Sequence, residues 1–258
     1  MISVLQLGTI DYSTGLRLQQ RLVELRKDGR IGDVLLLLEH TPVITLGRNA
    51  KAANIVASTE ALAQRGVEVF DCDRGGDVTF HGPGQLVGYP IFNLREMPVE
   101  EGKHKTLGAV AYVRKLEEVL IRTCADFGIA SKRVQGLTGV WTDTKPESKI
   151  AAIGVHISRA VTSHGFALNV NVDLDYFNLI IPCGITSKPV ISMAKELGKT
   201  VSMQDVAHSI SRNFGVVFRS QMLWLESIDL LLKTPVGVPL KVPEQLRRLH
   251  KEEESFWV

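Results

Sequence analysis

The chain of 258 residues has few of the features that mark an exported protein. It contains only three cysteines, Cys72, Cys124 and Cys183, which are widely spaced and form no CxxC pair. An odd and sparse cysteine count indicates reduced thiols rather than a disulfide framework. A free thiol is therefore available to act as a nucleophile.

Long apolar runs and strong charge are also missing. No run approaches the ~20 residues that a membrane-spanning helix needs, and residues 1–8 lack the basic and apolar segments of a signal peptide. The formal net charge of +2 is too small to indicate a nucleic-acid partner. We therefore expect a cytoplasmic protein that binds neither membranes nor nucleic acids.

The apolar residues that are present predict a mixture of strands and helices. A continuous apolar run at 33–39 is typical of a strand buried on both faces. The longest helical pattern covers 106–127, with a predicted core face formed by Val110, Val113, Leu116, Val119 and Leu120. Because strands and helices mix without strict βαβ alternation, we expect the α/β (α+β) class, with a mixed sheet flanked by helices.

Three serine or threonine positions predict helix starts. Ser13 or Thr14 is expected to cap a helix that reaches about residue 27, Ser58 one that ends near 64, and Ser202 a third. The composition changes after Leu232, where prolines interrupt the chain. We expect a main domain over 1–233 and a C-terminal extension over 234–258, either docked loosely or binding a partner.

Glycine is concentrated in one stretch from Arg74 to Gln85, which reads RGGDVTFHGPGQ. It lies between two predicted strands, at 67–70 and 86–94. Glycine is favoured where φ is positive or where a ligand approaches the main chain closely. The stretch therefore predicts a backbone-lined pocket, with a tight hairpin that carries an exposed arginine as the alternative.

Cys183 has the most unusual setting of the three thiols, because Pro182 and Gly184 leave it outside regular structure and sterically open. A thiol with a pKa of about 8.5 is mostly protonated at pH 7, so a nucleophilic cysteine needs a nearby cation or base. The candidates for that role are Lys149, Arg74, Lys188 and His81. The alternative for Lys149 is a strand-end lysine that points to water.

A hairpin is predicted from strands at 149–157 and 164–172, and small residues gather on it at Ala151, Ala152, Gly154, Gly165 and Ala167. They would leave room for an apolar ligand such as a medium-chain acyl group, although close helix packing needs them equally. His156 and His164 are expected at the exposed ends of this hairpin. No His, Cys, Asp or Glu grouping has metal-ligand spacing, so we expect no metal site.

Four ordered segments together resemble the lipoyl(octanoyl) transferases, the octanoyl-[acyl-carrier-protein]:protein N-octanoyltransferases of lipoate biosynthesis. The segments are the stretch 74–85, KIAAIG at 149–154, GFALNV at 165–170 and PCG at 182–184. The resemblance covers about 2–220 and also includes EHTPVITLGR at 39–48. It implies a fold like that of the biotin and lipoate-protein ligases, with 1–233 as the catalytic domain.

The resemblance also implies residue roles. Cys183 would carry an octanoyl thioester taken from octanoyl-acyl carrier protein, and Lys149 would lower the pKa of its thiol. The acceptor would be a lysine on a lipoyl domain of a 2-oxoacid dehydrogenase acyltransferase subunit, or on the glycine-cleavage H protein. No cofactor, metal or ATP is implied. The implied substrate-binding residues are Arg74, Gly75, Gly76, Asp77, Val78, Thr79, Phe80, His81, Ala152, Ile153, Gly154, Gly165, Phe166 and Ala167.

Three other functions stay open. An ATP-dependent lipoate or biotin-protein ligase would use the same fold, but those enzymes resemble RRxxGGGxVxHD at their glycine loop, whereas only two glycines follow Arg74 here. A non-catalytic acyl-binding module would use the groove of small residues without needing Cys183. An amidotransferase that moves lipoyl groups between proteins is a narrower possibility.

Overall fold

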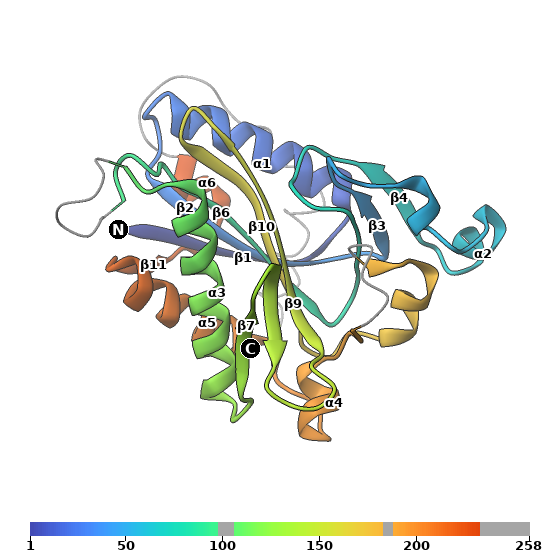
Figure 1. Ribbon diagram of the computed structural model, residues 1–258. Coiled ribbons are helices and arrows are strands. Elements are labelled where there is room, and N and C mark those ends of the chain that lie inside the picture. The colour runs from blue at the N-terminus through green and yellow to red at the C-terminus, as the bar shows by residue number, and fades with distance from the viewer. Residues whose placement is uncertain (98–105, 183–187, 233–258) are drawn as a thin grey trace, which may run out of the picture.

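The computed structural model describes residues 1–97, 106–182 and 188–232 (Figure 1). Its main layer is an eight-stranded sheet in the order β11-β1-β2-β6-β10-β9-β8-β7. The strands are β1 (Ile2–Ile10), β2 (Asp33–His40), β6 (Gln85–Ile91), β7 (Ser131–Val134), β8 (Leu137–Thr142), β9 (Lys149–Ser158), β10 (Val161–Asn169) and β11 (Met222–Trp224). β1 pairs in parallel with β2 and β11, and the other neighbours are antiparallel. The predicted mixed sheet is confirmed.

β2 explains why the sheet is covered on both sides. Its side chains alternate between two apolar clusters: Leu35 and Leu37 belong to one, and Val34, Leu36 and Leu38 belong to the other. Since successive residues of a strand point to opposite faces, both faces of the sheet are core. The expectation drawn from the apolar run is therefore confirmed.

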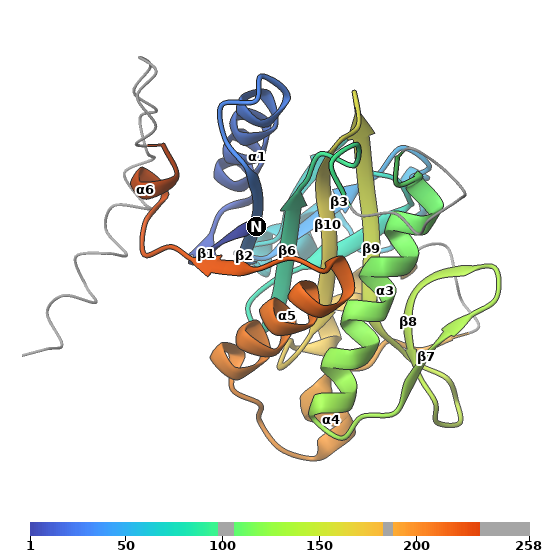
Figure 2. The same cartoon turned by 90° about the vertical axis from the view of Figure 1, so that its left-hand side faces the viewer.

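Helices cover the two faces (Figures 1 and 2). Leu18, Leu22 and Leu25 of α1 (Tyr12–Lys27) pack in the cluster on one face. The cluster on the other face holds residues of α3 (Ala109–Asp126), α5 (Met203–Phe218) and α4 (Met193–Leu197). The short helix α6 (Ile228–Leu232) returns to the α1 face through Ile228 and Leu231.

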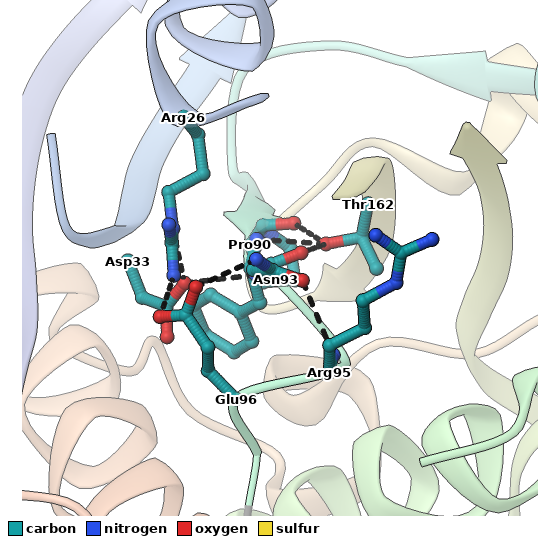
Figure 3. Close-up of polar contacts among 8 residues, drawn as sticks. Arg26, Asp33, Pro90, Asn93, Arg95, Glu96 and Thr162 are labelled. Carbon is teal, nitrogen blue, oxygen red and sulfur yellow. Dashed lines mark hydrogen bonds and ion pairs between the residues drawn. The ribbon is translucent and has the colours of Figure 1, made fainter. Parts of the chain in front are cut away.

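A buried ion pair fixes the end of α1 against the sheet (Figure 3). Arg26 Nε lies 2.8 Å from Asp33 Oδ1 at the start of β2, and Arg26 Nη2 lies 2.5 Å from Glu96 Oε2. The amide of Asn93 also donates to Asp33 Oδ1, at 2.9 Å. Burial raises the pKa of Asp33, although Arg26 and the Asn93 amide oppose that shift.

A smaller three-stranded sheet stands beside the main one, in the order β4-β3-β5. Its strands are β3 (Val43–Leu46), β4 (Glu68–Asp71) and β5 (Val78–His81). The helix α2 (Thr59–Gln64) connects β3 to β4 after a 3₁₀ turn (Ala52–Asn54), and a second 3₁₀ helix (Leu174–Leu179) closes the side of this sheet.

Several boundaries differ from those predicted. Asp11, not Ser13 or Thr14, caps α1, because its carboxylate accepts from the Thr14 amide. Val110 is 75% exposed and Tyr112 occupies the core-facing position, because Tyr112 lies four residues before the buried Leu116 and shares its face of α3, whereas Val110 lies six residues before it and does not. Ser58 and Ser202 cap their helices as predicted.

The stretch 74–85 contains a strand that was not predicted. Val78–His81 forms β5, because this run of β-forming residues pairs in register with β3. The predicted hairpin also extends further than expected. Arg159 and Ala160, both with positive φ, make its turn, so β10 begins at Val161. The extension 234–258 lies outside the described residues.

Candidate active site

A pocket opens between the two sheets, on the α1 face of the main one. It encloses about 490 Å³ of empty space, its open mouth included. Eleven of the fourteen residues expected to bind substrate line it: Arg74, Gly76, Asp77, Thr79, His81, Ala152, Ile153, Gly154, Gly165, Phe166 and Ala167. The fold therefore brings three separate segments of the sequence to one place.

The other three of the fourteen do not line this pocket. Val78 and Phe80 point to the opposite face of β5, into the apolar cluster of the small sheet, where Phe80 stacks on Tyr176 with ring centroids 4.7 Å apart. Strand alternation is the reason, because Thr79 and His81 occupy the positions that face the pocket. Gly75 instead donates its amide to the Val155 carbonyl at 3.0 Å and so ties the loop to β9.

Arg74 is buried in the pocket wall, with 7% of its surface exposed, so the alternative of an exposed arginine on a hairpin is wrong. Its guanidinium is held by β3: Nη2 donates to Thr45 O at 2.7 Å and to Thr45 Oγ1 at 2.9 Å. Nη1 donates to Gly75 O at 3.0 Å. Within the described ranges no carboxylate forms an ion pair with Arg74. The pocket wall therefore carries a positive charge that suits a polar or anionic group of a ligand.

Glycine is required where Arg74 crosses β9. A Cβ on Gly154 would lie 2.8 Å from the Gly75 oxygen and 3.2 Å from Arg74 Cδ. A Cβ on Gly165 would lie 2.1 Å from the Gly88 oxygen. These two glycines therefore let neighbouring backbone segments approach β9 and β10 closely. Ala152 and Ala167, which pair across the two strands, form part of the apolar pocket wall. The sequence alone did not separate these two uses of small residues.

The back of the pocket is aromatic and polar. Tyr12 stacks parallel to His81 at 6.4 Å between ring centroids, and the Tyr89 hydroxyl lies 2.6 Å from His40 Nε2. Burial lowers the pKa of His40 to about 4 and that of His81 to about 3. Both imidazoles are therefore neutral near pH 7.

His164 is a pocket residue that the sequence placed wrongly. It was expected at an exposed hairpin end, yet it is 3% exposed, because β9 and β10 continue past it and place it opposite Val155. Its Nε2 lies 2.7 Å from Asp73 Oδ1, and His156 approaches the other oxygen of the same carboxylate at 3.6 Å. Burial lowers the pKa of His164, although Asp73 opposes the shift.

Tyr12, Val87 and Tyr89 also line the pocket, and sequence reasoning missed them. Val87 and Tyr89 stand two residues apart on β6 and so share a face, which the strand period could have indicated. Tyr12 had no comparable signal, because it reaches the site only through the packing of α1.

Lys149 lies at the start of β9 and is 7% exposed, so the alternative of a lysine that points to water is wrong. Its Nζ lies 4.8 Å from the centroid of the Trp141 ring. Its backbone bridges to Val190, and its amide donates to Pro189 O at 2.8 Å. Lys149 is not among the pocket-lining residues. Cys183 lies outside the described residues.

The two other cysteines, Cys72 and Cys124, are not part of the pocket wall. Cys124 is buried in α3, and burial raises its pKa to about 12. Cys72 donates its thiol to Leu46 O at 3.2 Å. Among the described residues there is no group of three or more potential metal ligands placed to hold an ion, and no helix is long and apolar enough to cross a bilayer.

Comparison with known proteins decides the family. Residues 11–215 match the model of the lipoyl protein ligase A/B catalytic domain. The chain is 64% identical to an octanoyltransferase of Koribacter versatilis over 98% of both chains. It is 58% identical to an octanoyltransferase of Acidobacterium capsulatum over 90% of this chain and 96% of the relative. The chain belongs to the lipoyl(octanoyl) transferase family.

Membership makes this lipoyl(octanoyl) transferase an acyltransferase. Its fold is that of the lipoate-protein ligases. A structure of a bipartite lipoate protein ligase and its E2 lipoyl domain from Thermoplasma acidophilum matches with a TM-score of 0.67 at 15% identity, covering 100% of this chain and 95% of the other. The expected fold class is therefore confirmed.

Proposed function

We propose that this lipoyl(octanoyl) transferase moves an octanoyl group from octanoyl-acyl carrier protein to the ε-amine of a lysine on a lipoyl domain. The observation that carries the proposal is the pocket itself, which joins an apolar wall on β9 and β10 to the buried cation of Arg74. The apolar wall suits a medium acyl chain, and the names of the similar octanoyltransferases support the octanoyl group.

In the first step the Cys183 thiolate attacks the thioester carbonyl of octanoyl-acyl carrier protein. A new carbon–sulfur bond forms, the old one breaks, and the carrier's sulfur leaves and takes up the proton that the Cys183 thiol had given up. Lys149 supplies a buried positive charge that favours the thiolate over the thiol. Its backbone contacts with Pro189 and Val190 anchor it to the segment that follows 183–187.

In the second step the acceptor lysine, as a neutral amine, attacks the octanoyl thioester on Cys183. The carbon–nitrogen bond of the amide forms, the carbon–sulfur bond breaks, and the proton lost by the amine goes to the departing sulfur of Cys183. Exchange between thioesters is nearly balanced and conversion of a thioester to an amide is downhill. The reaction therefore requires neither ATP nor a metal ion.

The proposed acceptors are the lipoyl domains of 2-oxoacid dehydrogenase acyltransferase subunits and the glycine-cleavage H protein, with the cytoplasm as the compartment. The catalytic domain is proposed to cover 1–233. The C-terminal extension is proposed to cover 234–258. The ligase and acyl-binding alternatives predict different requirements for ATP and for Cys183, and one assay separates them from the proposed transfer.

The test is an incubation with octanoyl-acyl carrier protein without ATP, followed by intact-mass measurement. We expect one octanoyl adduct that is absent in Cys183→Ala, strongly reduced in Lys149→Ala and retained in the matched control Cys72→Ser. Added lipoyl domain should discharge the adduct. An adduct that persists in Cys183→Ala would exclude this nucleophile, and transfer that strictly requires ATP would support the ligase instead. Binding without any adduct would support the acyl-binding module.

A further inference from the structure

An unbroken series of hydrogen bonds joins the Arg74 guanidinium to the backbone of Ile191. The side chains that form it come from five places in the fold: the loop before β5, then β3, β5, β6 and β10. All of them are buried, with at most 8% of their surface exposed: Arg74, Thr45, His81, Gln85 and Asn169. Water cannot easily replace bonds in such a series, so the direction of each bond is set by the chemistry of the groups themselves.

The direction is fixed first at the far end. Asn169 Nδ2 lies 3.0 Å from the carbonyl oxygen of Ile191, which can only accept, so the Asn169 oxygen faces Gln85. Gln85 Nε2 donates to that oxygen at 2.9 Å and to the carbonyl oxygen of Phe80 at 3.2 Å. Turning either amide over would place oxygen against oxygen. Two backbone carbonyls therefore decide the orientation of both amides.

The orientation of Gln85 then decides the tautomer of His81. Gln85 Oε1 lies 2.7 Å from His81 Nδ1 and must accept, so the imidazole carries its proton on Nδ1 and a lone pair on Nε2. His81 Nε2 lies 3.5 Å from Thr45 Oγ1. That oxygen already accepts from Nε and Nη2 of Arg74, at 3.2 and 2.9 Å. The hydroxyl hydrogen of Thr45 is therefore left to point at His81 Nε2.

We propose that His81, Gln85 and Asn169 are positioning residues, whose one-directional series of bonds fixes the His81 tautomer and, through Thr45, holds the Arg74 guanidinium at the pocket. The inference rests on the proposed octanoyl transfer, in which Arg74 binds substrate. A protonated imidazole would offer Thr45 a donor instead of an acceptor. Burial lowers the pKa of His81 to about 3, so that form is not populated near neutral pH.

The same series also relates Arg74 to Lys149. Ile191, whose carbonyl ends the series, donates its own amide to Lys149 O at 3.0 Å. Two residues with separate proposed roles, one in the loop before β5 and one at the start of β9, are thereby placed relative to one another. A displacement of about 1 Å at a reacting group can reduce a rate about a hundredfold, so such a series is a means of holding geometry.

The first test measures the tautomer without any assay of activity. In protein labelled with ¹⁵N at histidine, we expect the His81 ring to show Nδ1 protonated and Nε2 unprotonated at pH 7. In Gln85→Leu the preference should be lost. A wild-type ring protonated on Nε2, or a tautomer unchanged in Gln85→Leu, would overturn the proposal. This result does not depend on the octanoyl reaction, so it separates failure of this inference from failure of the proposed function.

The second test compares transfer rates with a matched control. Thr45→Val and Gln85→Leu replace the polar groups of the series by apolar ones and so break it, and we expect kcat to fall between about tenfold and a hundredfold. The control is Asn213→Leu, which removes a buried amide bonded to Asp126, Thr123 and Ser209 on the opposite face. It should lower Tm but keep kcat. If the transfer rate falls in proportion to Tm in all three variants, the hydrogen bonds of the series contribute only to stability, and the proposal is refuted.

Discussion

Acidification from pH 7 to pH 5 is expected to destabilise the fold through the two buried histidines at the back of the pocket. An unfolded histidine has a pKa near 6.5, whereas burial lowers the pKa of His40 to about 4 and that of His81 to about 3. Between these values the unfolded chain binds protons that the folded chain does not. Stability is therefore fully present above pH 6.5 and is lost as the pH falls toward the folded pKa values.

The magnitude follows from the distance between pH 5 and the unfolded pKa. One and a half pH units, at about 1.4 kcal/mol for each unit, give about 2 kcal/mol for each histidine and about 4 kcal/mol for both. The groups that face the pair include Tyr12, Tyr89, Arg74 and His164. The positive charge of Arg74 opposes protonation of His81 and therefore reinforces the expected direction.

The assay is equilibrium unfolding in urea at pH 7, 6 and 5, for the wild type, His81→Gln and the control His208→Gln, whose side chain is exposed on α5. We expect the loss of unfolding free energy between pH 7 and pH 5 to be about 2 kcal/mol smaller in His81→Gln than in the wild type. The control should match the wild type. Equal losses in all three proteins would refute the assignment of a neutral, buried His81.

Three further predictions concern substitutions at single positions. Gly154→Ala should lower the free energy of unfolding by about 1–3 kcal/mol and slow transfer, because the new Cβ would meet the Gly75 oxygen and Arg74 Cδ. The stability comparison is Gly32→Ala, where the new Cβ meets no atom within 4 Å and φ is not positive. Unchanged transfer in Gly154→Ala would contradict the close contact. Phe80→Leu should lower Tm and leave KM unchanged, because its ring packs away from the pocket. Thr79→Val should instead leave Tm unchanged and raise KM, because Thr79 lines the pocket. A raised KM in Phe80→Leu would contradict this placement. Glu117→Gln should lower the free energy of unfolding, measured in urea, by about 2 kcal/mol at both low and high salt. The reason is that the fully buried Glu117 carboxylate binds Arg114, Arg133 and the Gly139 amide. A loss that depends strongly on salt would indicate that these pairs are exposed.

The main layer and the segments that form the site could be predicted from the amino-acid sequence. The apolar run of β2 required burial on both faces, and the ordered segments at 74–85, 149–154 and 165–170 indicated the family and most of the pocket wall. Local chemistry is sufficient for such features, because strand burial and glycine at close backbone contacts depend on neighbours in the chain. The caps at Ser58 and Ser202 were read correctly for the same reason.

How those segments meet depends on contacts between parts of the chain that are far apart in the sequence. The pairing of β5 with β3 sends Thr79 and His81 to the pocket and Phe80 away from it, and that register depends on a partner strand more than thirty residues earlier. The burial of His164 beside Asp73, and of Arg74 on Thr45, likewise depends on contacts between distant segments. The order of donors and acceptors from Arg74 to Ile191 has no signature in the sequence. Segments from five places in the fold must assemble before the Ile191 carbonyl can orient the Asn169 amide and, through it, the rest of the series.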